Sequence, residues 1–228
     1  MPSILSIETA TPICSSSLSH NGEVIISRES YEGQSHASLL GVFVNDIMNY
    51  IRQNNIQLDA VAVSSGPGSY TGLRIGVSEA KGLSYGLGIP LISIPTVKIM
   101  ASMMKDKVYE GSLICPMIDA RRMEVYSTFF DQNLNVIRKT MADIIESNSY
   151  RELLDDNKIV FFGSGSEKCK NIITHNNAHF IDDIHPLASA MAPLAEDAFL
   201  KKDFVDSAYF EPFYLKEFVA TTPKNKVF

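Results

Sequence analysis

The stretch SSGPGSYTGLRIG, from Ser64 to Gly76, has the residue types of a phosphate-binding loop. It follows an apolar run that predicts a strand, and it leads into a segment that predicts a helix. Backbone N–H groups in such a loop, together with the N-terminus of the next helix, can bind an anion. The Walker pattern GxxxxGK[ST] is absent, and Thr71 stands where the dinucleotide fingerprint needs its third glycine. Two interpretations remain: an unspecific anion site, or a tight turn in which Thr71 caps the helix.

Two histidines have the spacing of a metal-ligand pair. His175 and His179 are four residues apart, but Asn176-Asn177 between them favours a turn rather than a helix. We therefore predict a solvated loop there and not a metal site. His36 lies at the predicted start of a helix, where a surface or capping role is favoured over that of a catalytic base.

Two carboxylates flank a predicted hairpin in the second half of the chain. Asp119 and Glu124 could share acid–base work, since paired carboxylates can divide the roles of acid and base. Arg121 and Arg122 lie between them, however, and charge pairing is the favoured interpretation.

The elements that must position these residues alternate in type. Turn signals at Ala10-Thr11-Pro12 and Asn21-Gly22 separate three antiparallel strands at the start of the chain. The predicted order is three strands, a helix, a strand, a helix, a strand and a helix, which is the order of a ribonuclease-H-like core with a mixed sheet. The predicted segments are strands 3–9, 13–19, 23–27, 60–63 and 89–94, and helices 35–52 (capped by Ser35), 71–87 and 96–104.

Glycines interrupt the helix that follows the loop. Gly72, Gly76, Gly82 and Gly86 each cost a helix about 0.5–1 kcal/mol relative to alanine. This loss is tolerable where a small residue lets another backbone come close. Gly72 and Gly76 share one side of the helix, so we predict close packing there, within the fold or against a partner. The apolar stripe of the 35–52 helix is also wider than one buried face requires.

The pattern pauses in polar residues near Lys105-Asp106-Lys107 and then restarts. Strands are expected at 113–118, at 124–130 and after the turn 131–133, then a helix at about 142–154, a strand at 159–162 and a helical segment at about 187–200, with an irregular tail from Glu211. The strand that ends at Asp119 repeats the arrangement of the strand that ends at Glu8. We therefore predict two related subdomains, residues 1–106 and a smaller one at 107–228.

Composition excludes several classes of protein. The net charge is −6, so no basic field is available to attract a nucleic acid backbone. No apolar run approaches the roughly 20 residues that span a bilayer, and the first residues lack a signal-peptide pattern. A cytoplasmic protein is expected. Cys14, Cys115 and Cys169 lie in or beside apolar segments without CxxC spacing and are predicted to be reduced core residues.

Four segments together resemble the TsaB (YeaZ) family over nearly the whole chain. The resemblance is carried by ILSIETA at 4–10, SGPGSYTGLRIG at 65–76, IDARRMEVY at 118–126 and EPFYLK at 211–216. It implies an α/β fold of two ribonuclease-H-like subdomains, with mixed sheets flanked by helices, as in the acetate kinase, Hsp70 and actin superfamily.

The resemblance also implies a function. Members of this family take part in forming N6-threonylcarbamoyladenosine at position 37 of tRNAs that read codons starting with A. They are usually not the catalyst: they dimerise with and activate TsaD, help recruit the ATPase TsaE, and leave tRNA mainly to TsaD. TsaD-like proteins hold a metal with His-x-x-x-His, whereas Thr96 and Met100 stand at the aligned positions here. The resemblance thus implies no catalytic residues, no metal and no cofactor of its own.

The predicted site residues form two sets. The residues expected to face the partner are His36, Leu39, Leu40, Phe43, Ile47, Gly72, Leu73, Gly76 and Ala80. Those that would border a nucleotide or phosphate site shared with the partner are Glu8, Thr9, Gly66, Gly68, Ser69 and Thr71. On this assignment, Gly76→Leu should destroy the complex with TsaD and leave the monomer folded.

Two other functions fit the same features. One is an active enzyme of the superfamily, either a small-molecule kinase or a metallopeptidase of the M22 type. Such an enzyme needs a metal or phosphate constellation, of which Glu8, where the superfamily often has aspartate, is one candidate member. The other is a homodimeric binding module that uses the same two helices.

Overall fold

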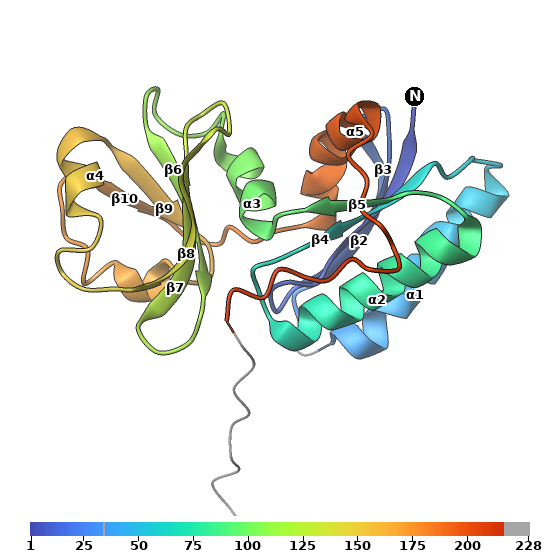
Figure 1. Cartoon of the computed structure of the whole chain (residues 1–228), viewed down its shortest axis with the longest axis horizontal. Helices are drawn as coiled ribbons and strands as arrows, with labels where there is room; N and C mark the ends of the chain where they lie inside the picture. The colour runs from blue at the N-terminus through green and yellow to red at the C-terminus, as the bar shows by residue number, and fades with distance from the viewer. Residues whose placement is uncertain (34, 217–228) are drawn as a thin grey trace, which may run out of the picture.

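The computed structural model describes residues 1–33 and 35–216 and contains two five-stranded mixed sheets (Figure 1). The first sheet consists of β1 (Ser3–Glu8), β2 (Cys14–His20), β3 (Glu23–Ser30), β4 (Ala60–Ser64) and β5 (Leu91–Ile94). The second consists of β6 (Leu113–Asp119), β7 (Glu124–Phe130), β8 (Val136–Ile144), β9 (Ile159–Phe162) and β10 (Ala178–Ile181).

The two sheets have the same strand order. The first runs β3-β2-β1-β4-β5, and the second runs β8-β7-β6-β9-β10. In each, the first strand in sequence is central, antiparallel to the second and parallel to the fourth. Central parallel strands are buried on both faces, which explains why β4 (AVAVS) is an uninterrupted buried run. The predicted fold class, mixed sheets flanked by helices, is confirmed.

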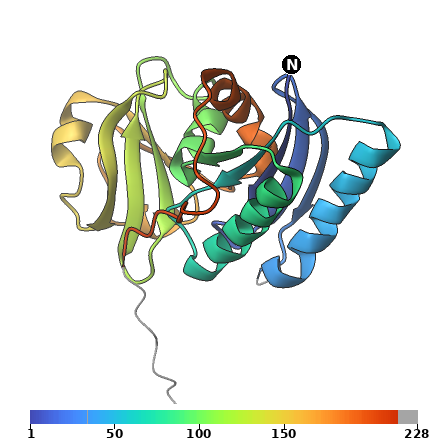
Figure 2. The ribbon, with the colours of Figure 1, turned by 45° about the vertical axis from the view of Figure 1, so that its right-hand side comes forward.

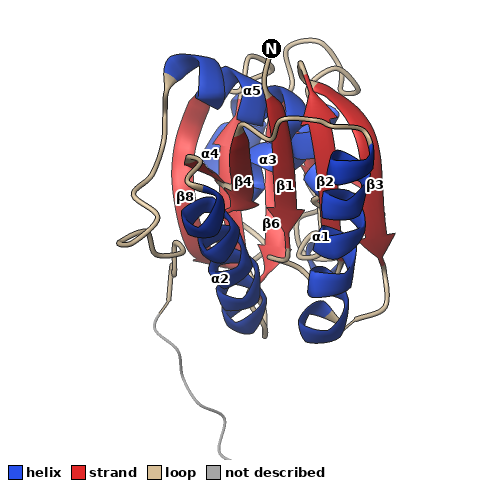
Figure 3. Cartoon of the chain, turned by 90° about the vertical axis from the view of Figure 1, so that its right-hand side faces the viewer, coloured by secondary structure: helices blue, strands red, loops and turns tan. Residues whose placement is uncertain are grey.

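Helices cover both faces of the first sheet. The long helices α1 (His36–Gln53) and α2 (Tyr70–Leu87) lie side by side on one face (Figures 2 and 3). The other face is covered by α5 (Ala192–Lys201) and the 3₁₀ helix η2 (Ala188–Met191). Leu40, Val44 and Ile47 of α1 recur at helical spacing and are buried in the sheet's core.

The two halves exchange helices. The helix α3 (Thr96–Met104) follows the first sheet in sequence but packs Val97, Met100 and Met104 onto the second sheet. Conversely, α5 comes after the second sheet and packs on β1 and β5 of the first. The predicted division between residues 106 and 107 falls between α3 and β6, and a unit of 107–228 would contain this returning helix. The division therefore remains a prediction.

The prediction of a helix at about 142–154 was wrong. Residues through Ile144 belong to β8, paired with β7, and the helix α4 is shorter (Arg151–Asp156). Asp143 explains the difference, because Oδ1 and Oδ2 accept hydrogen bonds from Arg138 within the same strand and Oδ2 also accepts one from Tyr150. This contact between side chains holds the segment extended.

Two further features concern the whole chain. The predicted core role of the three cysteines is confirmed, since all are buried and free. Among the described residues, no helix is both long enough and apolar enough to cross a membrane.

Candidate functional site

The carboxyl group of Glu8, at the end of β1, is fully buried. Its Oε1 accepts the N–H of Ala10 at 2.5 Å. Burial raises the pKa of Glu8 to about 7, against the lowering effects of the Ala10 N–H and the nearby Ser64 hydroxyl. Neither Oε2 of Glu8 nor Oγ of Ser64 has a hydrogen bond of normal geometry within the part of the chain that the structure describes. Glu8 is therefore a desolvated group that is about half protonated at pH 7.

The glycine-rich loop is closed onto the turn between β1 and β2. The N–H of Ser69 donates to the carbonyl of Ala10 at 2.7 Å. A Cβ atom at Gly68 would lie 2.3 Å from that same carbonyl oxygen, so only glycine fits. The N–H of Gly66 donates to Thr96 Oγ1 at 3.1 Å. These amides, which a phosphate would need, are already used within the chain.

The cap of α2 is not the predicted one. The hydroxyl of Ser69 accepts the N–H of Gly72 at 3.2 Å, so Ser69 occupies the cap position and Thr71 lies exposed in the first turn. The serine directly precedes the helix and can reach this N–H, whereas Thr71 is already helical. The proposed phosphate role of Ser69 and Thr71 remains a prediction.

The close packing predicted at the glycines occurs within the fold. A Cβ atom at Gly72 would lie 2.1 Å from the carbonyl oxygen of Thr9, and one at Gly76 would lie 2.1 Å from Thr9 Oγ1. The Thr9 hydroxyl also donates to the carbonyl of Gly72 at 2.8 Å. The expectation that Gly76→Leu leaves the monomer folded is therefore wrong, because leucine would displace Thr9. Gly82 and Gly86, by contrast, have no atom within 4 Å of the Cβ position.

The same turn also fixes the start of α1. Nε2 of His36 donates to the carbonyl of Thr11 at 2.8 Å and lies 3.3 Å from that of Ile13. The imidazole is buried, so the prediction of a surface or capping residue was wrong. Ser35 stands at the predicted cap position but makes no capping bond, because its hydroxyl donates to the carbonyl of Glu32 at 2.7 Å. The turn at residues 9–12 thus anchors both long helices.

The positions aligned with a histidine pair have structural roles. Thr96 accepts the Gly66 N–H, as described above, and it is fully buried. Met100 is also fully buried, and its Cε would lie 2.4 Å from a Cβ atom placed on Gly163. Thr96 thus contacts the loop after β4, and Met100 contacts the loop after β9.

The second half has an equivalent carboxylate, but in a different setting. Asp119 ends β6 and is exposed; it pairs with Lys168, which also donates to the carbonyls of Arg122 (2.8 Å) and Glu124 (2.7 Å). Glu124 pairs with Lys216. Charge pairing was predicted with Arg121 and Arg122, but these partners were wrong. The lysines are distant in sequence, and no spacing signal could have found them.

His175 and His179, which have the spacing of a metal-ligand pair, have different surroundings in the structure. His179 lies in β10, which the sequence did not predict, opposite Val160 of β9. Nε2 of His175 lies 3.3 Å from Asp155 Oδ1. Within residues 1–33 and 35–216, no group of three or more His, Cys, Asp or Glu side chains is arranged to hold a metal ion.

Most residues predicted to face a partner are buried by the chain itself. His36, Leu40, Ile47, Gly72, Leu73, Gly76 and Ala80 belong to the interior, while Leu39 and Phe43 are half-buried. Many outward residues of the two helices are small or uncharged, whereas Arg74 is exposed in the second turn of α2, and Asp46 and Glu79 are half-buried at mid-helix. We call the following set the α1–α2 face: Ala37, Ser38, Gly41, Val42 and Asn45 on α1, with Ser78, Gly82, Tyr85 and Gly86 on α2.

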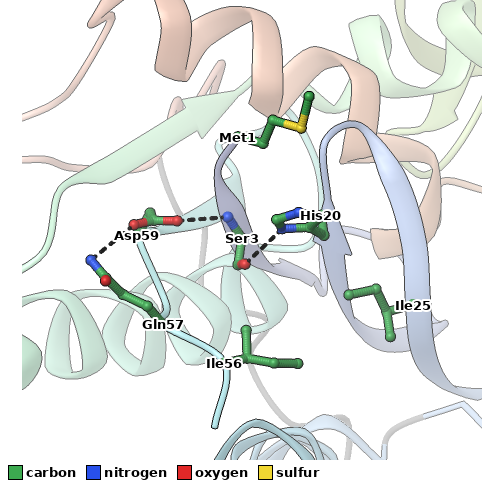
Figure 4. Close-up of a pocket in the computed structure, with 7 residues that line it drawn as sticks. All are labelled: Met1, Ser3, His20, Ile25, Ile56, Gln57 and Asp59. Carbon is green, nitrogen blue, oxygen red and sulfur yellow. Dashed lines mark hydrogen bonds between the residues drawn. The ribbon is translucent and has the colours of Figure 1, made fainter. Parts of the chain in front are cut away.

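Two hollows lie on the first half. One, of about 420 Å³, is lined by residues that include Ser3, His20, Gln57 and Asp59 (Figure 4). Its polar groups satisfy one another: Ser3 Oγ lies 3.0 Å from His20 Nδ1, and the Ser3 N–H donates to Asp59 Oδ2 at 2.8 Å. The other hollow, of about 350 Å³, lies between α2 and residues 210–214. This second hollow was not predicted from the sequence, although Tyr70, Arg74 and Tyr214 of its lining lie in the motifs 65–76 and 211–216.

The two mixed sheets of the same strand order and the loop closed onto the turn between β1 and β2 define a class: a two-part α/β protein built from a duplicated sheet. Residues 23–224 match the family model of TsaD, tRNA N6-adenosine threonylcarbamoyltransferase. The chain is 30% identical over 224 residues to the tRNA threonylcarbamoyladenosine biosynthesis protein TsaB of Escherichia coli, covering 95% of this chain and 96% of that one. It is 28% identical to TsaB of Haemophilus influenzae over 227 residues, covering 93% of each chain.

Solved structures agree with this relationship. A Pseudomonas aeruginosa protein with similarity to peptidase YEAZ superposes with a TM-score of 0.81 at 23% identity, covering 95% of this chain and 100% of that one. YeaZ from Pseudomonas aeruginosa gives a TM-score of 0.77 at 23% identity, covering 94% and 100%. The chain belongs to the TsaB (YeaZ) family, within the wider group that the TsaD model describes.

Proposed function

We propose that this chain is an essential non-catalytic subunit in the formation of N6-threonylcarbamoyladenosine at position 37 of tRNAs that read codons starting with A. It dimerises with TsaD through the α1–α2 face, activates it and helps recruit the ATPase TsaE. TsaD supplies the catalytic groups and most of the contacts with tRNA. The reaction takes place in the cytoplasm.

The observation that carries the proposal is the lack of charge on the α1–α2 face. Residues 37–45 of α1 (ASLLGVFVN) contain no charged side chain, and Val42 is 52% exposed. The cores of protein interfaces are depleted of charge in this way. Gly41, Gly82 and Gly86 have open space at the Cβ position, so a partner's side chains or backbone can approach these helices closely.

The junction at Glu8 supports the non-catalytic role. Its loop amides bond to Ala10 and Thr96, and its glycines pack on Thr9, so these groups are engaged within the chain and not available to bind a phosphate. The buried turn at 9–12 then serves to hold α1 and α2 in one arrangement. A rigid pair of helices is what a partner needs in order to dock without further ordering.

The test is reconstitution of the modification. Purified TsaD, TsaE, threonylcarbamoyl-adenylate and tRNA are incubated with and without this protein, and the modified nucleoside is quantified by mass spectrometry. We expect modification only when the protein is added, and none from the protein alone. Modification by the protein alone would contradict the proposal, as would full activity of TsaD and TsaE without it.

A second readout separates heterodimer from homodimer. Sedimentation of the protein alone and mixed with TsaD gives the mass of each assembly. We expect the mixture to form a heterodimer at the expense of any homodimer. A homodimer that persists unchanged beside free TsaD would favour the stand-alone binding module.

A further inference from the structure

Hydrogen bonds hold the segment of residues 208–214 against α2 and its preceding loop, and so define the groove between them. Lys81 donates through Nζ to the carbonyls of Ala208 (3.1 Å) and Phe210 (3.0 Å). The N–H of Phe213 donates to the carbonyl of Ser65 at 2.7 Å. The lining consists of Tyr70, Arg74, Val77, Ser78, Lys81, Phe210, Glu211, Pro212 and Tyr214. Hydrogen bonds at two points therefore fix one wall of the groove against the other.

The groove carries positive charge in an acidic protein. Arg74 and Lys81 form no ion pair with any described residue, and the hydrogen-bond acceptors of Lys81 are carbonyl oxygens and not carboxylates. Glu211 contributes one carboxylate to the lining. Lys216, a little further along the segment, pairs with Glu124 of the β6–β7 hairpin.

The hairpin that Lys216 contacts carries two further basic side chains. Arg121 and Arg122 at its tip are exposed and form no ion pair within residues 1–33 and 35–216. Both have left-handed backbone conformations, with φ of 68° and 49°. Consecutive residues in this conformation are costly for arginine and are often found at functional sites.

Aromatic rings lie in the same groove. The rings of Tyr70 and Tyr214 have centroids 4.9 Å apart and are tilted by 41°. The Arg74 guanidinium lies 5.4 Å from the Tyr70 centroid and donates to its hydroxyl at 3.0 Å. Tyr214 is 36% exposed, so part of its ring faces solvent. Basic side chains beside exposed aromatic rings are the pattern that binds single-stranded nucleic acid, through phosphate contacts and base stacking.

We propose that this groove binds a single-stranded RNA loop, with Arg74 and Lys81 contacting phosphates and Tyr214 stacking on a base. The inference rests on the proposed function, since position 37 of a tRNA lies in the single-stranded anticodon loop. The segment that forms the groove lies on the opposite side of α2 from α1 (Figures 2 and 3). Ser78 lines the groove and also belongs to the α1–α2 face, so the groove borders the surface on which the partner would sit.

The experiment measures RNA binding directly. A fluorescein-labelled anticodon stem–loop is titrated with the full-length protein, and anisotropy is recorded at several salt concentrations. We expect affinity to fall with salt, and Arg74→Glu to weaken binding about tenfold or more and lower the salt slope by about one. Tyr214→Ala should weaken binding at least about fivefold. Matched controls are Lys202→Glu and Tyr209→Ala, which alter an exposed cation and an exposed tyrosine outside the groove and should stay within about twofold.

The outcomes separate the two proposals. Wild-type protein that does not bind the stem–loop, or variants that bind it like wild type, would overturn the groove assignment, whatever the modification assay gives. Groove-dependent binding by a protein that leaves TsaD inactive would overturn the proposed function and keep the groove. Far-UV circular dichroism checks that the variants fold, and Arg74→Gln provides a milder version of the same change.

Discussion

The end of β1 and the end of β6 occupy the same place in the two sheets, yet the chain builds them differently. At β1, the Glu8 carboxyl is fully buried, and the loop after β4 closes over it by packing glycines on Thr9 and Ala10. At β6, the Asp119 side chain is 49% exposed, and Lys168 holds the hairpin through one carboxylate and two carbonyls. One junction is sealed around a carboxyl that is about half protonated at pH 7, whereas the other is open and held by an ion pair.

The helices above the two junctions differ accordingly. The sealed junction anchors α1 and α2, each of 18 residues, through His36, Thr9 and Ser69. In the second half, α4 has 6 residues. The comparison suggests that an interior contact between loop and turn is what fixes a long pair of helices, and that a charged surface contact suffices where no such pair has to be held.

The largest effect should come from filling the sealed junction. Gly72→Ala places a Cβ atom 2.1 Å from the Thr9 carbonyl oxygen, so the backbone must shift. We expect the free energy of unfolding to fall by about 3–4 kcal/mol, measured by urea denaturation. Ser78→Ala, an exposed position on the same helix, should change it by less than about 0.5 kcal/mol. A Gly72→Ala protein as stable as wild type would break the account of the junction.

The next effect should depend on pH. Because burial raises the pKa of Glu8 from 4.5 unfolded to about 7 folded, the folded state holds its proton longer. The contribution of Glu8 to stability is thus fully present below about pH 4.5 and declines as pH rises to about 7, by about 2–3 kcal/mol. Glu8→Gln removes this decline. The free energy of unfolding of the wild type minus that of the variant should therefore fall between pH 5 and pH 8.

The matched variant at the open junction is Asp119→Asn. At pH 7 the free energy of unfolding of this variant should be lower than that of the wild type by about 1 kcal/mol or less, because the lost ion pair with Lys168 is partly exposed. A difference between wild type and Glu8→Gln that is flat with pH would show that Glu8 is not desolvated as the structure implies.

At the lysine of the open junction we expect an effect smaller than those at Gly72 and Glu8. Lys168→Met leaves the carbonyls of Arg122 and Glu124 without a donor, but water can reach this surface. We expect a loss of about 1–2 kcal/mol in thermal or urea unfolding. Lys139→Met on the exposed part of β8 is the control and should be neutral. A loss as large as that of Gly72→Ala would remove the contrast between the junctions.

The smallest effect has the opposite sign. Gly82→Ala and Gly86→Ala lie in the same helix as Gly72, with open space at the Cβ position. Each should stabilise the free protein by about 0.5–1 kcal/mol, because alanine is the better helix former. Destabilisation by either, seen as a lower melting temperature, would mean that the close packing of α2 extends beyond its first two turns.

Local pattern was enough to predict much of the fold. Apolar periodicity and the turn signals at Ala10-Thr11-Pro12 and Asn21-Gly22 predicted the order of the first eight elements. The similar arrangement of the strands that end at Glu8 and at Asp119 indicated the duplicated sheet. The strand β10 was missed because it is short, contains His179 and directly follows Asn176-Asn177; its pairing with β9 stabilises a segment whose own sequence gives little strand signal.

The site was predicted less well because its contacts are distant in sequence. The glycines of α2 signalled a close approach, but not that Thr9, 63 residues before Gly72, makes it. Glu8 was found as a strand-end carboxylate, yet its burial depends on the closed loop. The groove joins Tyr70 of α2 to Tyr214, and nothing within either segment alone indicates that the two rings meet.

The most direct test of the central claim compares the outward surfaces of the two halves. Val42 on α1 and Ile137 on β8 are exposed to almost the same extent, 52% and 50%. We expect Val42→Asp to raise the Kd for TsaD at least about a hundredfold by burying a charge in the interface, and Ile137→Asp to change it less than about threefold. Both variants should unfold like wild type. Val42→Asp that still pairs with wild-type affinity, or equal losses from both variants, would contradict the assignment of the α1–α2 face.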